Sequence, residues 1–299
     1  MDDAAQLPAP AYVVVGHVAR DLVPLSDNSG APSYVPGGTA LYAALTARRL
    51  GVDTGVITSA PPDVDTALLD GARVHIVPSA QATIFENRYG PGGRVQYLHG
   101  RAAPIKPGDV PIAWRAARIL HLGPIADEVD PAIAALFSRA LRAATPQGWA
   151  RRWDEDHRVH TLPHERVAAR LAGAGLDVVI FSEEDVSAGQ SAGHETQEAI
   201  VDLYREIARI VVLTRGARGA TIYAGNGVMH VPAYSAREVD PTGAGDVFAA
   251  AFLIRYAAAK DLLGAARFAA AAAALEVEGI GPNGIPTAEQ IAARLETLL

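Results

Sequence analysis

The sequence contains no cysteine among its 299 residues. This absence excludes a disulfide, a thiolate nucleophile and a cysteine-ligated metal site. Positive charge is also scarce, because the formal net charge is −7 and the chain has no run of Lys and Arg. A protein that follows a phosphate backbone needs a basic surface, so we expect no nucleic-acid partner.

Long apolar runs are missing as well. A bilayer span requires roughly 18 apolar residues, and the alanine-rich run 268–275 is far shorter. Residues 1–11 are acidic and lack the basic start and the apolar block of a signal peptide. We therefore expect a cytoplasmic protein without a membrane partner. With 49% hydrophobic and 20% charged residues, the chain has the composition of an ordinary globular protein.

Short β-branched runs alternate with alanine-rich segments along most of the chain. The runs are continuous in Val, Ile and Leu, as parallel strands buried on both faces are, and lie at 12–15, 55–58, 74–77, 119–122, 178–181 and 210–214. Helices are expected between them at 39–50, 131–144 and 195–208. This alternation predicts an α/β fold with a mostly parallel central sheet.

Two segments, 22–36 and 81–101, interrupt the alternation. Both combine turn signals with alternating residues and lack a helical period, which indicates β-hairpins. Together the hairpins would form a small second sheet, a lid over the carboxyl ends of the main strands, where such folds bind ligands. No linker is evident, so we expect one domain over residues 1–299.

A glycine-rich turn, Asp240-Pro-Thr-Gly-Ala-Gly-Asp246, precedes an apolar, alanine-rich helix. The unpaired N–H groups at a helix start attract anions, and glycine lets a phosphate approach the backbone closely. Asp246 has two interpretations. A carboxylate in a first helical turn is favoured as a cap, whereas a carboxylate beside an anion site also serves as the base of a phosphoryl transfer. The turn by itself leaves both open.

This turn resembles the C-terminal signature of the PfkB, or ribokinase-like, family of carbohydrate and nucleoside kinases. Asp240, Thr242 and residues 243–246 match it position by position. The resemblance implies a ribokinase-like, three-layer α/β/α fold with Asp246 as catalytic base. It also implies that the N–H groups of Gly243, Ala244 and Gly245 hold the γ-phosphoryl group, and that Asp240 and Thr242 lie in the nucleotide region.

Two earlier segments extend the resemblance toward the N-terminus. Asp21 resembles the family's aspartate that binds substrate hydroxyls, and Gly37 with Gly38 resembles the glycine pair that brings backbone against the substrate. Taken singly, an aspartate after a strand starts a turn and a glycine pair forms a loop. Their order and spacing before Asp246 favour substrate binding instead.

A nucleotide site is implied by two segments in the C-terminal half. Thr214, Gly216 and Gly219 match the family's Thr-x-Gly-x-x-Gly segment, although the same residues would also form a hairpin turn. The helix at 270–274, which includes Ala273, and the loop 278–286 resemble the segments that flank adenine. The helix by itself would be assigned to the core. The resemblance therefore implies ATP as phosphoryl donor.

The metal assignment departs from the family pattern. The family commonly has an Asn-x-x-Glu pair that organises Mg²⁺ through water, whereas this chain has Ser182-Glu-Glu-Asp185. Asp185 aligns with the carboxylate of that pair, and Glu183 or Glu184 would substitute for it. A monovalent cation such as K⁺ is a further cofactor that the resemblance allows.

The acceptor is expected to be a small hydroxylated molecule. Tyr42 replaces the asparagine of the sugar-binding signature, which argues against a ribose-type contact. Segments 82–89, 121–125 and 148–154 resemble plant-type myo-inositol kinases, so a cyclic polyol is the first expectation and a nucleoside the main alternative. Asn87 and Arg88 would meet substrate hydroxyls from the lid, unless they form a solvated strand face. Lids in this family also pair across a homodimer.

Three other functions have partial support in the sequence. Gly189-Gln-Ser-Ala-Gly193 fits the nucleophile elbow of serine hydrolases, but no buried strand leads directly into it. His157, His160 and His164 lie close together in sequence, but no helical spacing presents them on one face as metal ligands. A sugar sensor without catalysis would have lost Asp246.

Overall fold

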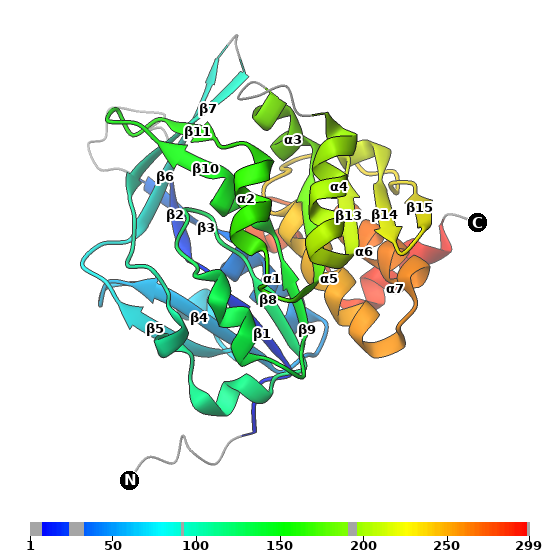
Figure 1. Ribbon diagram of the computed structural model, residues 1–299, viewed down its shortest axis with the longest axis horizontal. Helices are drawn as coiled ribbons and strands as arrows, with labels where there is room; N and C mark the ends of the chain where they lie inside the picture. The colour runs from blue at the N-terminus through cyan, green and yellow to red at the C-terminus, as the bar shows by residue number, and fades with distance from the viewer. Residues whose placement is uncertain (1–7, 24–32, 91–92, 191–195, 298–299) are drawn as a thin grey trace.

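The computed structural model describes residues 8–23, 33–90, 93–190 and 196–297. Its main sheet has nine strands in the order β15-β14-β13-β12-β9-β8-β1-β4-β5 (Figure 1). From β13 to β5 all neighbouring strands run parallel, whereas β14 and β15 form an antiparallel edge. In sheet order the bounds are Gly227–Val231, Ala220–Ala224, Ala208–Thr214, Leu176–Ser182, Leu141–Ala144, Ile119–Leu122, Tyr12–Val15, Thr54–Ala60 and Arg73–Pro78.

Helices cover both faces of this sheet (Figure 1). Val14 and Val212 point into a core with α1 (Thr39–Arg49), α5 (Ala244–Ala259) and α6 (Leu262–Glu276). Their neighbours Val13 and Val211 point into a second core with α2 (His164–Leu171) and α4 (Gln197–Ile207). Strands buried on both faces explain the continuous apolar runs. The expected three-layer, ribokinase-like arrangement is therefore confirmed.

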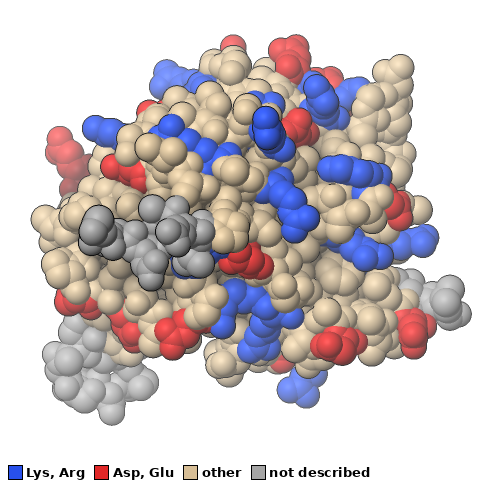
Figure 2. Space-filling view, turned by 90° about the horizontal axis from the view of Figure 1, so that it is seen from below, with Lys and Arg blue, Asp and Glu red and all other residues tan. Residues whose placement is uncertain are grey.

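Two further helices complete the described elements. α3 (Glu183–Gln190) follows directly from β12, and α7 (Ala288–Glu296) packs against α6. In the described ranges, no helix has the length and apolarity to cross a membrane. On the face of the molecule in Figure 2, Lys and Arg side chains are interspersed with Asp and Glu.

The lid is a separate four-stranded sheet in the order β3-β2-β6-β7. It consists of β2 (Ala19–Val23) with β3 (Ser33–Gly37) and of β6 (Thr83–Gly90) with β7 (Gly93–Gly100), each pair antiparallel. Both expected hairpins are present, and β2 joins them by pairing with β6 in parallel. The first one starts at Ala19 rather than at residue 22. Residues 24–32 and 91–92 lie outside the described ranges.

A small core lies beneath the lid. Ala19, Phe85 and Leu98 from the lid strands pack on Ile125 and Ala126, which belong to the loop after β8. A short antiparallel pair, β10 (Arg151–Trp153) and β11 (Val159–Thr161), runs beside β7. The lid is thus held to the body by apolar contacts near its base.

The helix expected over residues 131–144 is wrong. Only a 3-10 helix, η5 (Pro131–Leu136), forms at its start, where Asp130 caps the N–H of Ala132. Residues Leu141–Ala144 instead form β9, which pairs with β8 and β12 in the middle of the sheet. Alanine favours helix in isolation, but burial between two strands outweighs a propensity of less than about 1 kcal/mol per residue.

Candidate active site

The segments of interest meet at one edge of the main sheet. Parallel strands end on the same side, so the residues that follow β1, β8, β12 and β13 lie near one another. α5 packs against β8 and β12. This edge therefore combines a helix N-terminus with the polar residues that leave the strands.

Gly243 gives the turn before α5 its shape. It is the N-cap residue, with φ 94° and ψ −10°, a left-handed conformation that glycine adopts without strain. A Cβ at this position would overlap the ring of Tyr42, which is buried on α1. Tyr42, the residue that departs from the family pattern, thus packs under the turn. The N–H of Ala244 is 3.3 Å from the Pro241 carbonyl, while Gly245 is exposed.

Asp240 ties this turn to the end of α6. Its carboxylate accepts hydrogen bonds from the N–H groups of Thr242 and Gly281, both at 3.0 Å. Partial burial raises the pKa of Asp240, but the hydrogen bonds from Thr242 and Gly281 outweigh it, so the pKa is lowered overall. Gly281 opens the short helix η8 (Gly281–Gly284). Asp240 therefore remains charged and fixes the loop that was expected near adenine.

Asp246 lies in the first turn of α5 and is half-buried. Loss of water around the carboxyl raises its pKa to about 6, and the neighbouring Asp185 carboxylate also raises it. A hydrogen bond from the Thr39 side chain and the charge of Arg151 lower it in part. The turn shows no side-chain cap. A carboxyl with a pKa near 6 can accept or release a proton close to neutral pH.

Asp21 and the glycine pair lie together at the base of the lid. Asp21 is on β2, opposite Val35 of β3 and Phe85 of β6. A Cβ on Gly37 would overlap the Asp21 carboxylate, so backbone and carboxylate lie in direct proximity. Gly38 is the N-cap of α1 with φ 95°, and Thr39, which contacts Asp246, follows it. The structure brings Asp21, Gly37 and Gly38, three of the expected substrate-binding residues, to the start of α1.

Asn87 and Arg88 lie on opposite faces of β6, since side chains alternate along a strand. Asn87 shares the face of Phe85 and accepts a hydrogen bond from Gln96 at 3.0 Å. Arg88 is exposed, donates to both Glu86 oxygens at 2.7 and 2.9 Å, and lies 4.4 Å from the Tyr97 ring centroid. Both residues were expected to face a substrate beneath the lid. Only Asn87 lies on the face toward the body, whereas Arg88 lies on the opposite face.

The expected donor segments follow β13 and form the end of α6. Thr214 closes β13, and Gly216 and Gly219 have positive φ in the link η7 (Gly216–Arg218) to β14. Since β13 and β14 are antiparallel, these residues do form the hairpin turn that was the alternative interpretation. Ala273 is half-buried, whereas Ala271 and Ala272 belong to the core.

Ser182 positions Asp185. These are the two residues that align with the Asn-x-x-Glu pair of the family. The Asp185 carboxylate accepts from the N–H and the hydroxyl of Ser182, each at 3.0 Å, and from the side-chain amide of Gln147 at 3.3 Å. Glu183 pairs with Arg218, and Glu184 is exposed. The described residues contain no group of three His, Cys, Asp or Glu suited to a metal. One carboxylate fits Mg²⁺, which keeps waters and binds substrate phosphates.

A scan against protein-family models matches residues 115–288, more than half of the chain, to "pfkB family carbohydrate kinase". The chain belongs to this family of kinases. A cytidine kinase of Thermococcus kodakarensis is 26% identical over 262 residues, 84% of this chain and 90% of the relative. A fructokinase of Escherichia coli is 29% identical over 258 residues, 80% of this chain and 82% of the relative.

A solved structure also matches this pfkB kinase. It is a pyrophosphate-dependent kinase of the ribokinase family, complexed with a pyrophosphate analog and myo-inositol. It is 25% identical, has a TM-score of 0.74, and the match covers 91% of this chain and 96% of that one. The ribokinase-like fold and the family expected from the sequence are confirmed.

The three histidines considered as metal ligands, His157, His160 and His164, have separate neighbours and form no metal-binding group among the described residues. His164 is buried, with Nδ1 2.8 Å from the Tyr204 hydroxyl. His160 pairs with Asp154 at 2.7 Å. His157 lies near His99, their ring centroids 6.2 Å apart. Ser191, the nucleophile of the hydrolase alternative, lies outside the described residues.

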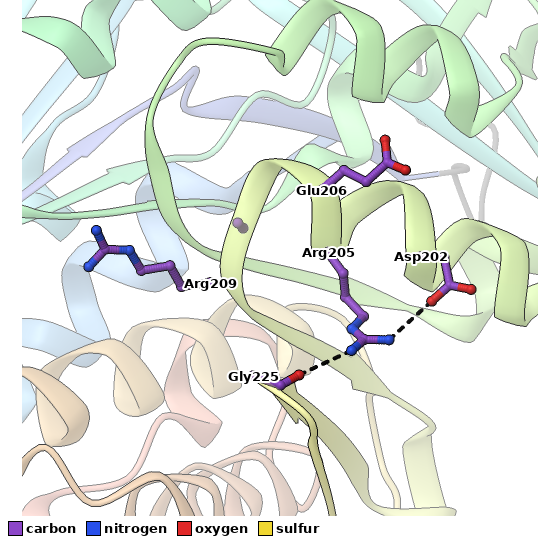
Figure 3. Close-up of a pocket in the computed structure, with 6 residues that line it drawn as sticks. Asp202, Arg205, Glu206, Arg209 and Gly225 are labelled. Carbon is purple, nitrogen blue, oxygen red and sulfur yellow. Dashed lines mark hydrogen bonds and ion pairs between the residues drawn. The ribbon is translucent and has the colours of Figure 1, made fainter.

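Two surface hollows lie away from Asp246. One is lined by charged residues at the amino end of β13, where Arg205 pairs with Asp202 at 3.2 Å and donates to the Gly225 carbonyl at 3.0 Å (Figure 3). The other is apolar and follows β4, with Pro61, Pro62 and Ile76 in its wall. Since the first is at the opposite end of β13 from Thr214, it is not part of the site of this kinase.

Sequence reasoning missed three groups in this kinase. Arg151 and Gln147 come from the segment after β9. Arg151 lies in segment 148–154, which resembles myo-inositol kinases, but the resemblance gave it no role, and no motif marks Gln147. Glu276, at the end of α6, is fully buried, and neither carboxylate oxygen has a hydrogen-bond partner in the described residues. Burial, followed by the charges of Asp240 and Asp246, raises the pKa of Glu276 to about 9. The only sequence feature that could have pointed to Glu276 is its position as the lone glutamate of an alanine-rich helix.

Proposed function

We propose that this kinase phosphorylates a hydroxyl group of a small polyol or sugar, with an inositol-like cyclic polyol as the preferred acceptor. The observation that carries the proposal is Asp246, whose pKa is raised to about 6 at the N-terminus of α5. A carboxylate with this pKa accepts a proton at neutral pH, and the helix N-terminus beside it favours a transferring phosphoryl group.

In the proposed reaction, Asp246 accepts the proton of the acceptor hydroxyl. The hydroxyl oxygen forms the new bond to phosphorus while the bond from phosphorus to the leaving oxygen of the donor breaks. Asp21, Gly37, Gly38 and Asn87 would hold the acceptor beneath the lid. The N–H groups of the turn, chiefly those of Gly243 and Gly245, would stabilise the charge on the phosphoryl group.

The proposed donor is ATP. Thr214, Gly216, Gly219 and the end of α6 with Ala273 would hold it, and Asp240 with Thr242 would fix the turn beside its phosphates. Asp185 would hold Mg²⁺, which neutralises phosphate charge when bound. Pyrophosphate is the alternative donor, because a similar structure uses it. A requirement for K⁺ stays a prediction.

A nucleoside is the one acceptor class that competes with a polyol. The cytidine kinase that covers 84% of this chain favours a nucleoside. Against it, the myo-inositol complex matches 91% of the chain with a TM-score of 0.74, and Tyr42 occupies the position of the usual sugar-binding asparagine. We therefore place the polyol first.

Assays that combine each donor with each acceptor test the proposal. ATP and pyrophosphate would each be offered with inositols, fructose, ribose and nucleosides, and product formation followed by ³¹P NMR, with the Asp246→Asn protein as blank. We expect a phosphate monoester from an inositol with ATP. Turnover of nucleosides alone would overturn the polyol proposal, and turnover with pyrophosphate alone would overturn the donor.

Assembly and domain organisation are part of the proposal. We propose residues 1–299 as one kinase domain that pairs through its lid, where Tyr34 and Val35 of β3 are 41% and 42% exposed. Light scattering would give the mass of a homodimer, and Tyr34→Lys would shift it toward the monomer. An unchanged mass in that variant would place the interface elsewhere. The cytoplasmic location inferred from the sequence stays a prediction.

A further inference from the structure

Glu128 is a buried acidic residue that the proposed reaction does not use. It follows the loop 123–127 after β8 and is 1% exposed. Its Oε1 accepts hydrogen bonds from the N–H groups of His17 and Ile125, each at 3.0 Å, and its Oε2 accepts from those of Ile125 and Ala126, at 2.9 and 2.6 Å. Hydrogen bonds to a carboxylate are roughly twice as strong as those between neutral groups. Glu128 therefore joins the end of β1 to the loop after β8.

His17 carries this connection on to the lid. Its buried imidazole has Nε2 2.9 Å from the Ala103 carbonyl and Nδ1 2.7 Å from the Thr83 hydroxyl. Burial lowers the pKa of His17, and a neutral ring can donate to the carbonyl from Nε2 while Nδ1 accepts from the hydroxyl. Thr83 opens β6, and its Oγ1 also accepts from the N–H of Ala102, just after β7, at 3.0 Å. The bases of β6 and β7 thus meet the end of β1 at one imidazole.

The loop after β8 is held through its carbonyl groups as well. Arg101, which follows β7, donates from Nε to the Ala126 carbonyl at 2.7 Å and from Nη2 to the Asp127 carbonyl. Asp127 has φ 58°, a left-handed conformation that aspartate adopts more readily than most residues. The chain turns there, and the Glu128 carboxylate accepts from N–H groups that precede the turn. The lid and the body therefore hold this loop from both sides.

The same contacts support residues that are proposed to bind the acceptor. A Cβ on Gly38 would lie 2.6 Å from the His17 carbonyl oxygen and 3.1 Å from Cδ1 of Ile125. Gly38 therefore lies against two residues whose N–H groups donate to Glu128. The strand β2, which carries Asp21, starts two residues after His17. A shift at the end of β1 would thus move both sides of the proposed acceptor site.

We propose that Glu128 is a positioning residue for the acceptor, which fixes the base of the lid against the ends of β1 and β8 through His17 and Thr83. This inference rests on the proposed function, because the acceptor and its site are proposed above. With these contacts in place, Asp21 and Gly38 keep their positions beneath the lid. Loss of the Glu128 carboxylate should therefore weaken acceptor binding and leave donor binding unchanged.

The first experiment follows the lid without any substrate. Hydrogen–deuterium exchange, measured by mass spectrometry, would compare the parent protein, Glu128→Gln and Asp130→Asn. Glutamine has the shape of glutamate but turns an amide N–H₂ group toward at least one backbone N–H. We expect exchange in 83–88 and 95–100 to become roughly tenfold faster in Glu128→Gln, with α5 at the parental rate. Asp130, whose carboxylate accepts from the N–H of Ala132 in the next segment, provides the matched control.

The second experiment measures KM for acceptor and donor separately. In Glu128→Gln the acceptor KM should rise roughly tenfold, about the worth of one hydrogen bond. The donor KM should stay at its parental value, because the hydrogen bonds described for Glu128, His17 and Thr83 do not reach residues 214–219 or 240–246. Thr83→Val, which removes the hydroxyl but keeps the shape, should show the same split, and Thr83→Ser should restore the parental KM. A merely structural role would lower kcat through loss of folded protein and leave both KM values unchanged.

A parental acceptor KM in folded Glu128→Gln, or an equal rise in the donor KM, would overturn the proposal. If Glu128→Gln does not fold, Thr83→Val and Thr83→Ser decide by the same two measurements. Faster lid exchange in a protein that phosphorylates none of the acceptors offered would confirm that Glu128 holds the lid to the body and would refute the kinase reaction proposed above. The two failures are therefore distinguishable.

Discussion

The two sides of Asp246 are built differently. On the α5 side, shape comes from backbone: Gly243 in the left-handed region, Asp240 tied to two N–H groups, and Tyr42 packed beneath the turn. On the lid side, polar groups such as Asn87 project from a single layer of strands. The comparison teaches that the proposed phosphoryl-transfer half depends on the core, whereas the proposed acceptor half depends on replaceable side chains.

Asp246→Asn is expected to give the largest effect. Loss of the base should lower kcat by about a hundredfold to ten-thousandfold, with donor binding retained, because asparagine keeps the shape and cannot accept the proton. Steady-state kinetics with donor affinity by calorimetry would check this. Asp202→Asn, an exposed change on α4, is the control. A variant with near-parental kcat would show that the α5 side does not supply the base.

Gly243→Ala is expected to give the second-largest effect. The position has φ 94°, and a Cβ there would overlap the Tyr42 ring, so we expect a loss of about 1–3 kcal/mol in stability and a fall in kcat. Thermal unfolding and kinetics would measure both. Gly245→Ala is the matched control, because a Cβ at 245 meets nothing within 4 Å. Equal stability losses in the two variants would contradict the backbone argument.

Glu276→Gln tests the buried α5 side of the site through its effect on the free energy of unfolding, not on the reaction rate. The folded-state pKa of Glu276 is raised to about 9, so its stabilising contribution is complete below the unfolded value, near pH 4.5, and is lost as pH rises toward 9. The glutamine variant should therefore match the parent near pH 4 and exceed its stability at pH 8 by a few kcal/mol, on the order of 1.4 per pKa unit. Denaturant unfolding at several pH values would show this.

A lower stability of Glu276→Gln at pH 8 would contradict that expectation. If the loss appeared only with added K⁺ or Na⁺, the two unpartnered carboxylate oxygens would instead be ligands of a cation.

Asn87→Ala and Arg88→Ala give the smallest expected effects and separate the two faces of the lid. Asn87 faces the body, so its loss should raise the KM of the acceptor by roughly fivefold to twentyfold, the worth of one or two hydrogen bonds. Arg88 points away and pairs with Glu86 at the surface, so its loss should leave KM unchanged. Acceptor kinetics would decide, and a larger effect at Arg88 would reverse the assignment of the faces.

Much of the molecule was predictable from local sequence. The expected strand over 12–15, the helix at 39–50 and both lid hairpins appear with boundaries shifted by a few residues at most. Residues 240–246 indicated an anion-binding turn because glycine and a helix start each constrain the backbone locally. Periodicity and turn chemistry act over a few residues, so a sequence carries them directly.

Other features were decided only by the tertiary structure. Residues 141–144 read as helix but became β9, because the two strands on either side bury them. Asn87 and Arg88 were separated by the pleat of a sheet whose register depends on distant strands. Burial raises the pKa of Asp246, and the charges of Arg151 and Asp185, 95 and 61 positions away in sequence (246 − 151 and 246 − 185), shift this pKa in opposite directions. The sequence by itself determined the turn that carries Asp246, whereas folding determined the pKa of its carboxyl, because electrostatic energy depends on distance and burial in space.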